Sequence, residues 1–105
     1  MKTPLDKKSV ILDIAMNLNR IGNYAADNFE ATRERVKMFI NQTSQYIDDL
    51  KNEEFNESFK ETYQNFLAEY RSLEKLEENK DKFRWAEKMM TWGNILTHRA
   101  KLIRP

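Results

Sequence analysis

Positions in the first half of this chain that carry apolar or small residues recur at alternating steps of four and three, the spacing of one helix face. The positions that share this face are 11, 15, 18, 22, 25, 29, 32, 36, 39, 43, 46 and 50. No proline lies between Pro4 and Pro105 to interrupt a helix. The pattern predicts long helices, the first of which opens with Thr3 as N-cap and Pro4 at its first position.

Residues 11–50 fit either one helix or two. Because the apolar face keeps its phase throughout, one interpretation is a single helix of about 45 residues, roughly 68 Å long. The other is a tight break between Ala25 and Asn28, where Asp27 or Asn28 would be the N-cap of a second helix. We favour the break.

Two further amphipathic segments follow. The third predicted helix carries a narrow aromatic stripe at steps of four and three, made of Phe55, Phe59, Tyr63, Phe66, Tyr70 and, at its end, Leu73. Asn56 or Ser58 would cap this helix. The fourth helix is predicted over about 81–103, and the connections over 52–54 and 77–81.

The fourth helix has a bulky side and a small side. Its bulky residues are Trp85, Met89, Trp92, Leu96 and Ile103, and its small ones are Ala86, Gly93, Thr97 and Ala100. A glycine inside a helix costs roughly 0.5–1 kcal/mol relative to alanine. Gly22 and Gly93 therefore predict helix–helix contacts in which another backbone comes close, and we expect the first helix to lie against the fourth.

These elements predict an all-α fold, with a single domain over residues 1–105. The expected architecture is an antiparallel, up-and-down bundle of four helices, or of three if the first two are continuous. Only 40% of the residues are hydrophobic and 33% are charged. The apolar residues must therefore be gathered in an efficient stripe on each helix, or a second chain must complete the core. We expect a homodimer.

The residues that enzymes use for catalysis are scarce. Cysteine is absent, which excludes disulfides and thiolate metal sites. Two glycines cannot build a glycine-rich phosphate loop, and the Glu-x-x-His pairs of di-metal bundles are absent. His98, the only histidine, falls opposite the bulky side of the fourth helix. We expect no enzymatic activity, no cofactor and no metal.

The first residues lack the apolar core of a secretion signal, and no segment approaches the ~20 apolar residues of a membrane span. A cytoplasmic protein without membrane contact is expected. Its net charge is +1, distributed as +2 over residues 1–47, −5 over 48–82 and +4 over 83–105. Such an asymmetry can steer a partner or orient a second copy.

The candidate partner-binding residues are on the fourth helix. Trp85 and Trp92 are seven residues apart and share a face, which Lys88 and Arg99 flank. Aromatic and arginine side chains are the usual anchors of protein interfaces. The sequence therefore predicts a small non-catalytic module for protein–protein interaction, an adaptor or a regulator.

Two alternatives remain open. A nucleic-acid-associated module would use the basic residues of the fourth helix, which are Arg84, Lys88, Arg99, Lys101 and Arg104. Binding to phosphate groups depends on concentrated positive charge. The acidic third helix and the nearly neutral total charge therefore disfavour this alternative. A weaker alternative is a bundle that binds a small molecule, with Arg20 and Asn94 in its site.

Overall fold

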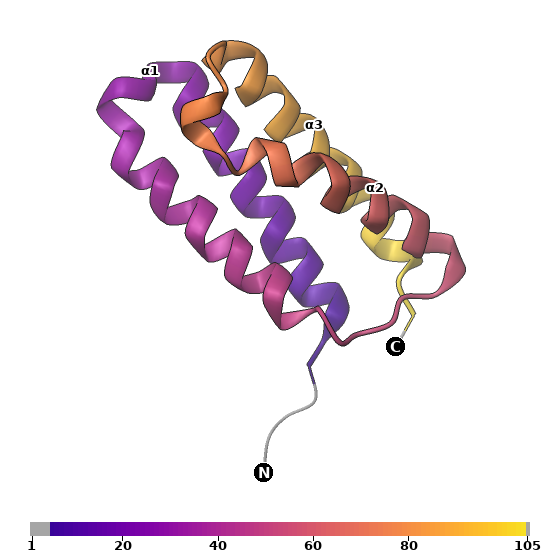
Figure 1. Cartoon of the computed structure of the whole chain (residues 1–105). Helices are drawn as coiled ribbons and strands as arrows, with labels where there is room; N and C mark the ends of the chain where they lie inside the picture. Colours follow the sequence, from indigo (N-terminus) through magenta and orange to yellow (C-terminus); the bar gives the residue numbers. More distant parts are fainter. Residues whose placement is uncertain (1–4, 105) are drawn as a thin grey trace.

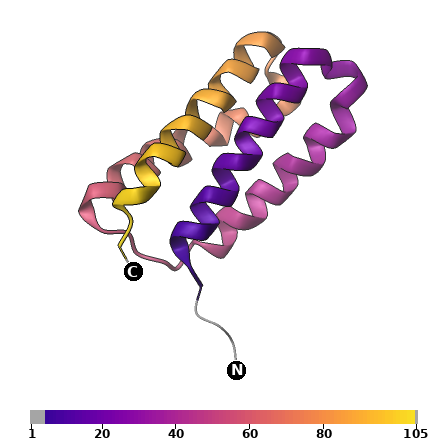
Figure 2. The ribbon, with the colours of Figure 1, turned by 180° about the vertical axis from the view of Figure 1, so that it is seen from behind.

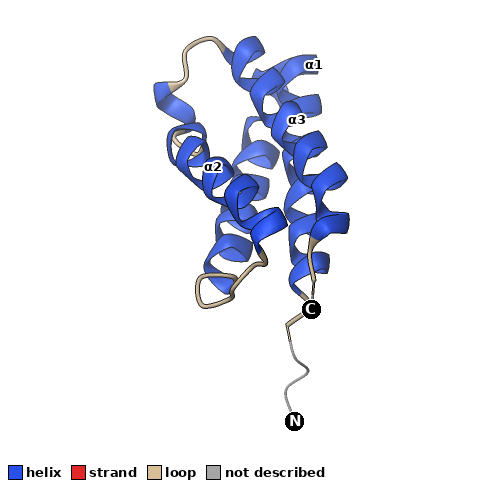
Figure 3. Cartoon of the chain, turned by 90° about the vertical axis from the view of Figure 1, so that its right-hand side faces the viewer, coloured by secondary structure: helices blue, strands red, loops and turns tan. Residues whose placement is uncertain are grey.

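The computed structural model describes residues 5–104 as three α-helices with two short 3₁₀ turns (Figure 1). The elements are α1 (Lys7–Asp49), α2 (Glu57–Leu73), η1 (Leu76–Glu78), α3 (Lys82–Arg99) and η2 (Ala100–Leu102). No strand occurs in this part of the chain (Figure 3). The all-α class is confirmed. None of the helices within residues 5–104 combines the length and the apolar character needed to cross a bilayer.

Helix α1 changes direction at Asn28. This residue has extended backbone angles, φ −156° and ψ 90°. Its side-chain Oδ1 accepts a hydrogen bond from the N–H of Ala31 at 3.1 Å, as an N-cap does. The favoured break near Ala25–Asn28 is therefore present. We call residues 7–27 arm 1 and residues 29–49 arm 2.

The two arms of α1 lie side by side, with arm 2 running back along arm 1 (Figures 1 and 2). Nδ2 of Asn17 donates to Oε1 of Gln42 at 3.0 Å. Nearer the turn, the rings of Tyr24 and Phe39 are stacked with centroids 6.0 Å apart. Asn17 is only 2% exposed, so its bond to Gln42 satisfies a polar group that would otherwise be costly to bury.

Helices α1 and α3 approach each other closely at the two glycines. A Cβ atom added to Gly22 would lie 2.8 Å from the carbonyl oxygen of Ala86 and would also collide with Met90. A Cβ added to Gly93 would lie 2.8 Å from Cγ of Asn19. The first and last helices therefore pack together as expected, with a backbone atom as neighbour at Gly22 and a side chain as neighbour at Gly93.

Trp85 joins α3 to the other elements in the core. It is 2% exposed, and its indole N–H donates to the carbonyl oxygen of Leu73 at 2.8 Å. Its ring meets that of Phe29 edge-on, with centroids 6.5 Å apart. One side chain thus connects the start of α3 with the end of α2 and the start of arm 2.

The N-terminus of α1 differs from its predicted position. Asp6 is the N-cap, since its Oδ1 accepts from the N–H groups of Lys8 and Ser9 at 3.2 and 3.4 Å. Thr3 and Pro4, which were expected to open the helix, lie outside the described residues.

Helix α3 is shorter than predicted because a contact to the α2 N-terminus redirects the chain after it. Asn56 occupies the N-cap position of α2, but its side chain accepts no capping hydrogen bond from a backbone N–H of that helix and instead donates to Oγ of Ser58 at 3.0 Å. Its amide donates to the carbonyl of Leu102 at 2.8 Å and accepts from the N–H of Arg104 at 2.9 Å. The residues after Arg99 therefore form η2 and an extended end.

We predict different costs for alanine at the two glycines. Gly22→Ala is expected to lower the free energy of unfolding by about 1–3 kcal/mol, because its Cβ meets backbone and the helices must separate. Gly93→Ala is expected to change it by less than about 1 kcal/mol, because the amide of Asn19 can rotate and alanine favours the helix. Urea denaturation of both variants measures the difference, and an equal loss would contradict this account.

Candidate functional site

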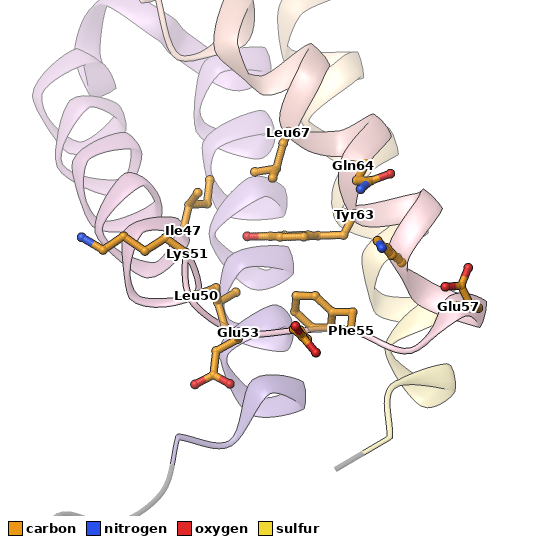
Figure 4. Close-up of a pocket in the computed structure, with 11 residues that line it drawn as sticks. Ile47, Leu50, Lys51, Glu53, Phe55, Glu57, Tyr63, Gln64 and Leu67 are labelled. Carbon is orange, nitrogen blue, oxygen red and sulfur yellow. The ribbon is translucent and has the colours of Figure 1, made fainter.

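A groove of about 580 Å³ opens between the end of arm 2 and α2 (Figure 4). Its apolar lining consists of Ile47, Leu50, Phe55, Tyr63 and Leu67. Ligand pockets in proteins commonly enclose roughly 300–1,000 Å³ and are mainly apolar, with a few polar groups. The volume of this groove falls within that range, whereas its lining is apolar only in part, since Gln64 and five charged residues also border it; we refer to it as the Tyr63 groove.

The groove exists because α2 is held away from α1 by large side chains. Cα atoms of α1 and α3 approach within 8 Å along the helices, whereas those of α1 and α2 hardly do so. The space is bridged by aromatic rings, among which Phe55 lies 5.1 Å from Phe59 and 4.9 Å from Tyr63, between centroids. Where the rings do not fill the space, the groove remains.

Phe55 precedes α2, and Lys7 of arm 1 holds this loop in place. The Lys7 ammonium donates to the carbonyl oxygen of Glu54 and lies 5.6 Å from the centroid of the Phe55 ring. A cation over an aromatic face contributes about 0.5–1 kcal/mol at an exposed site. The lower wall of the groove is thus fixed by a contact with the first turn of α1.

The Tyr63 side chain lies across the groove from α2 toward arm 2, between Leu67 and Phe55 (Figure 4). It is 7% exposed, and within residues 5–104 its buried hydroxyl has no hydrogen-bond partner. Burial raises the pKa of Tyr63 to about 12, so the hydroxyl stays protonated at neutral pH and remains a donor. A buried donor without a partner costs about 1–3 kcal/mol.

Tyr70 shows the usual arrangement of a buried tyrosine in the same helix. Its hydroxyl donates to the carbonyl oxygen of Ile40 in arm 2, at 3.4 Å, and burial raises its pKa as well. The contrast makes the free hydroxyl of Tyr63 a specific feature of the groove, since both residues belong to one aromatic stripe.

The rim of the groove carries charges of both signs. The lysines are Lys51 and Lys60, and the carboxylates are Glu53, Glu54 and Glu57. Lys51 also lies 3.5 Å from Asp48, which is on the same turn of arm 2. A mixed rim does not select a strongly charged ligand, so the apolar floor and the Tyr63 hydroxyl determine what the groove can bind.

The predicted anchor Trp85 lies in the core and cannot be reached by a partner in this structure. Trp92 is partly buried against Phe66, with ring centroids 5.6 Å apart. Its indole N–H donates to Oε2 of Glu69 at 3.0 Å, and Nζ of Lys88 lies 4.0 Å from the other oxygen of that carboxylate. Trp92 and Lys88 therefore share a partner within the chain.

Arg99, the fourth candidate, is exposed at the end of α3. It lines a hollow of about 380 Å³ between α2 and α3 together with Trp92, Glu57 and Glu61. The four residues predicted to form one face are thus divided between the core, an internal carboxylate contact and a hollow with acidic walls.

The other candidates do not form a common site. Arg20 lies over the Phe39 ring, whereas Asn94 is on the exposed side of α3, and no hydrogen bond joins them. His98 is exposed near the end of α3. Within residues 5–104, no three acidic or histidine side chains are close enough together to hold a metal ion.

No protein-family model matches this chain, and neither the curated proteins nor the solved structures include a match. Its function is therefore argued from its own residues.

We predict that Tyr63→Phe stabilises the protein. Phenylalanine keeps the ring but removes the unpaired hydroxyl, so the free energy of unfolding should rise by about 1 kcal/mol. Tyr70→Phe is the matched control, because it removes a hydroxyl that is bonded, and it should lower that free energy by about 0.5–1.5 kcal/mol. Urea denaturation compares the two, and a loss of stability in Tyr63→Phe as large as in Tyr70→Phe would contradict the assignment.

Proposed function

We propose that this chain is a small non-catalytic module for protein–protein interaction, which holds an apolar side chain of a partner protein in the Tyr63 groove. The observation that carries the proposal is the unpaired hydroxyl of Tyr63 in an apolar groove of about 580 Å³. The hydroxyl is itself buried, so a partner that inserts an apolar side chain would have to move the side chains that cover it before a backbone carbonyl oxygen could accept its hydrogen bond.

The free energies expected from burial and hydrogen bonding in the groove support a transient contact. Burying one leucine- or phenylalanine-sized side chain contributes about 1.5–3 kcal/mol. Pairing the free hydroxyl recovers about 1–3 kcal/mol. Together they correspond to dissociation constants from roughly ten millimolar to tens of micromolar, before the entropic cost of association. Tighter binding would require further contacts with the charged rim, which would then supply specificity.

The structure offers less support for the nucleic-acid alternative. The basic residues Arg84, Lys88, Arg99, Lys101 and Arg104 are all exposed. However, Glu57 and Glu61 line the same hollow as Arg99, and Lys88 lies beside Glu69. Carboxylates at these places reduce the attraction for phosphate on which nucleic-acid binding depends. We therefore keep protein binding as the proposed function.

The proposal includes three finer expectations from the sequence. With the arms of α1 counted separately, the module is an antiparallel, up-and-down bundle of four helices. It works in the cytoplasm, and it forms a homodimer. The dimer is supported by large apolar side chains that stay exposed, among them Phe83 with an exposed fraction of 65% and Met16 with one of 49%.

Selection of binders from a random peptide library tests the function. Peptides that bind should carry an apolar anchor residue, and Ile47→Glu, which puts a charge into the groove, should abolish their binding. Gln45→Glu is the matched control at an exposed position of arm 2 and should bind normally. Tyr63→Phe should bind about tenfold more weakly, although it is expected to be the more stable protein. Peptides that bind Ile47→Glu as well as the unaltered protein would contradict the proposal.

Light scattering on a sizing column tests the dimer. We expect a mass of twice the 12.6 kDa of one chain, unchanged on dilution, and a lower mass for Phe83→Lys. A monomer at all concentrations would contradict this part of the proposal and leave the groove unaffected.

A further inference from the structure

Four side chains on the solvent side of α1 form a continuous stack that joins its two arms. At the centre, the rings of Tyr24 and Phe39 are parallel within 7°, with centroids 6.0 Å apart. The guanidinium carbon of Arg20 lies 5.5 Å from the centroid of Phe39, and that of Arg35 lies 5.2 Å from the centroid of Tyr24. We call these four residues the arginine–aromatic stack.

The two guanidinium groups are positioned by the rings but are not neutralised. Each has five N–H donors. The guanidinium of Arg20 uses one of these donors, to Oδ1 of Asn17 at 3.4 Å. The guanidinium of Arg35 donates no hydrogen bond within residues 5–104. No carboxylate oxygen in this part of the chain lies within 4.0 Å of either group. Arg33, on the same arm as Arg35, does form an ion pair, with Glu77.

The free donors suit oxygen anions. A guanidinium binds a carboxylate through two parallel N–H···O bonds, and such charge-assisted bonds are among the stronger ones in proteins. Stacking on the rings holds each guanidinium in place, so little conformational freedom remains to be lost when an anion binds. Two positioned, unpaired guanidiniums therefore form a receptor for two acidic groups.

The surroundings of the stack indicate an acidic polypeptide rather than a nucleic acid. Met38 is 55% exposed and lines a shallow hollow with Arg35, where an apolar side chain of a partner can lie. A guanidinium lies over each of the two rings, which leaves less ring face on which a base could stack.

We propose that the arginine–aromatic stack is a second binding surface of this protein, which takes an acidic segment of a partner protein. Carboxylates of the segment bind the guanidiniums of Arg20 and Arg35, and an apolar residue between them contacts Met38. This surface shares no residue with the Tyr63 groove, so it does not depend on the function proposed above.

The probe for this proposal is a synthetic peptide of repeated Glu-Glu-Leu units, titrated at physiological ionic strength. In the NMR spectrum of the unaltered protein, the side-chain Nε–H signals of Arg20 and Arg35 should shift. That of Arg71, an exposed arginine on α2, should not. The matched Gln-Gln-Leu peptide should bind at least about tenfold more weakly, because it lacks the charge.

Variants separate the stack from the other charges and from the groove. Arg20→Gln/Arg35→Gln should weaken binding of the acidic peptide by about tenfold or more, whereas Arg71→Gln and Tyr63→Phe should bind it normally. Arg20→Lys/Arg35→Lys keeps both charges but loses the planar groups, and several-fold weaker binding is expected. Thermal unfolding confirms that each variant is folded.

Three results would overturn the proposal. The first is equal binding of the acidic peptide by the unaltered protein and by Arg20→Gln/Arg35→Gln. The second is equal binding of the Glu-Glu-Leu and Gln-Gln-Leu peptides. The third is tighter binding of an oligothymidylate than of the acidic peptide, since this would make the surface a nucleic-acid site.

Discussion

The contact of α1 with α3 at Gly22 sets the spacing of the other helices. Because the carbonyl oxygen of Ala86 in α3 lies only 2.8 Å from where a Cβ of Gly22 would be, any larger residue at this position would force the two helices apart. Arm 2 and α2 lie farther apart, with aromatic side chains between them. A bundle that is tight on one side and wide on the other leaves room for a groove on the wide side.

Trp85 and Trp92 show how one helix face can serve two structural purposes. Trp85 is enclosed where α2, α3 and arm 2 meet, and the carbonyl of Leu73 satisfies its indole N–H. One heptad later, Trp92 reaches the surface and bonds to Glu69 instead. Both indoles stabilise the contact between α2 and α3, so the binding surfaces have to be sought elsewhere.

Arm 2 separates the two surfaces that we propose. Its α2-facing side contributes Ile47 and Leu50 to the Tyr63 groove, and its arm 1-facing side contributes Arg35 and Phe39 to the arginine–aromatic stack. If both proposed surfaces bind, one helix would hold two segments of a partner, or two partners, together, as the proposed adaptor function requires.

The sequence by itself determined the all-α class and predicted the pairing of the first helix with the last, and it favoured a break near Asn28 without deciding between that break and one continuous helix. These features follow from local signals: the spacing of apolar residues, a capping side chain, and glycines on a small-residue face. Only the tertiary structure decided that Trp85 is buried, that the Tyr63 hydroxyl lacks a partner while that of Tyr70 has one, and that Arg20 and Arg35 stack on rings from opposite arms. The physical reason is that burial and hydrogen bonding depend on which distant residues meet, and the spacing of residues along a single helix does not contain that information.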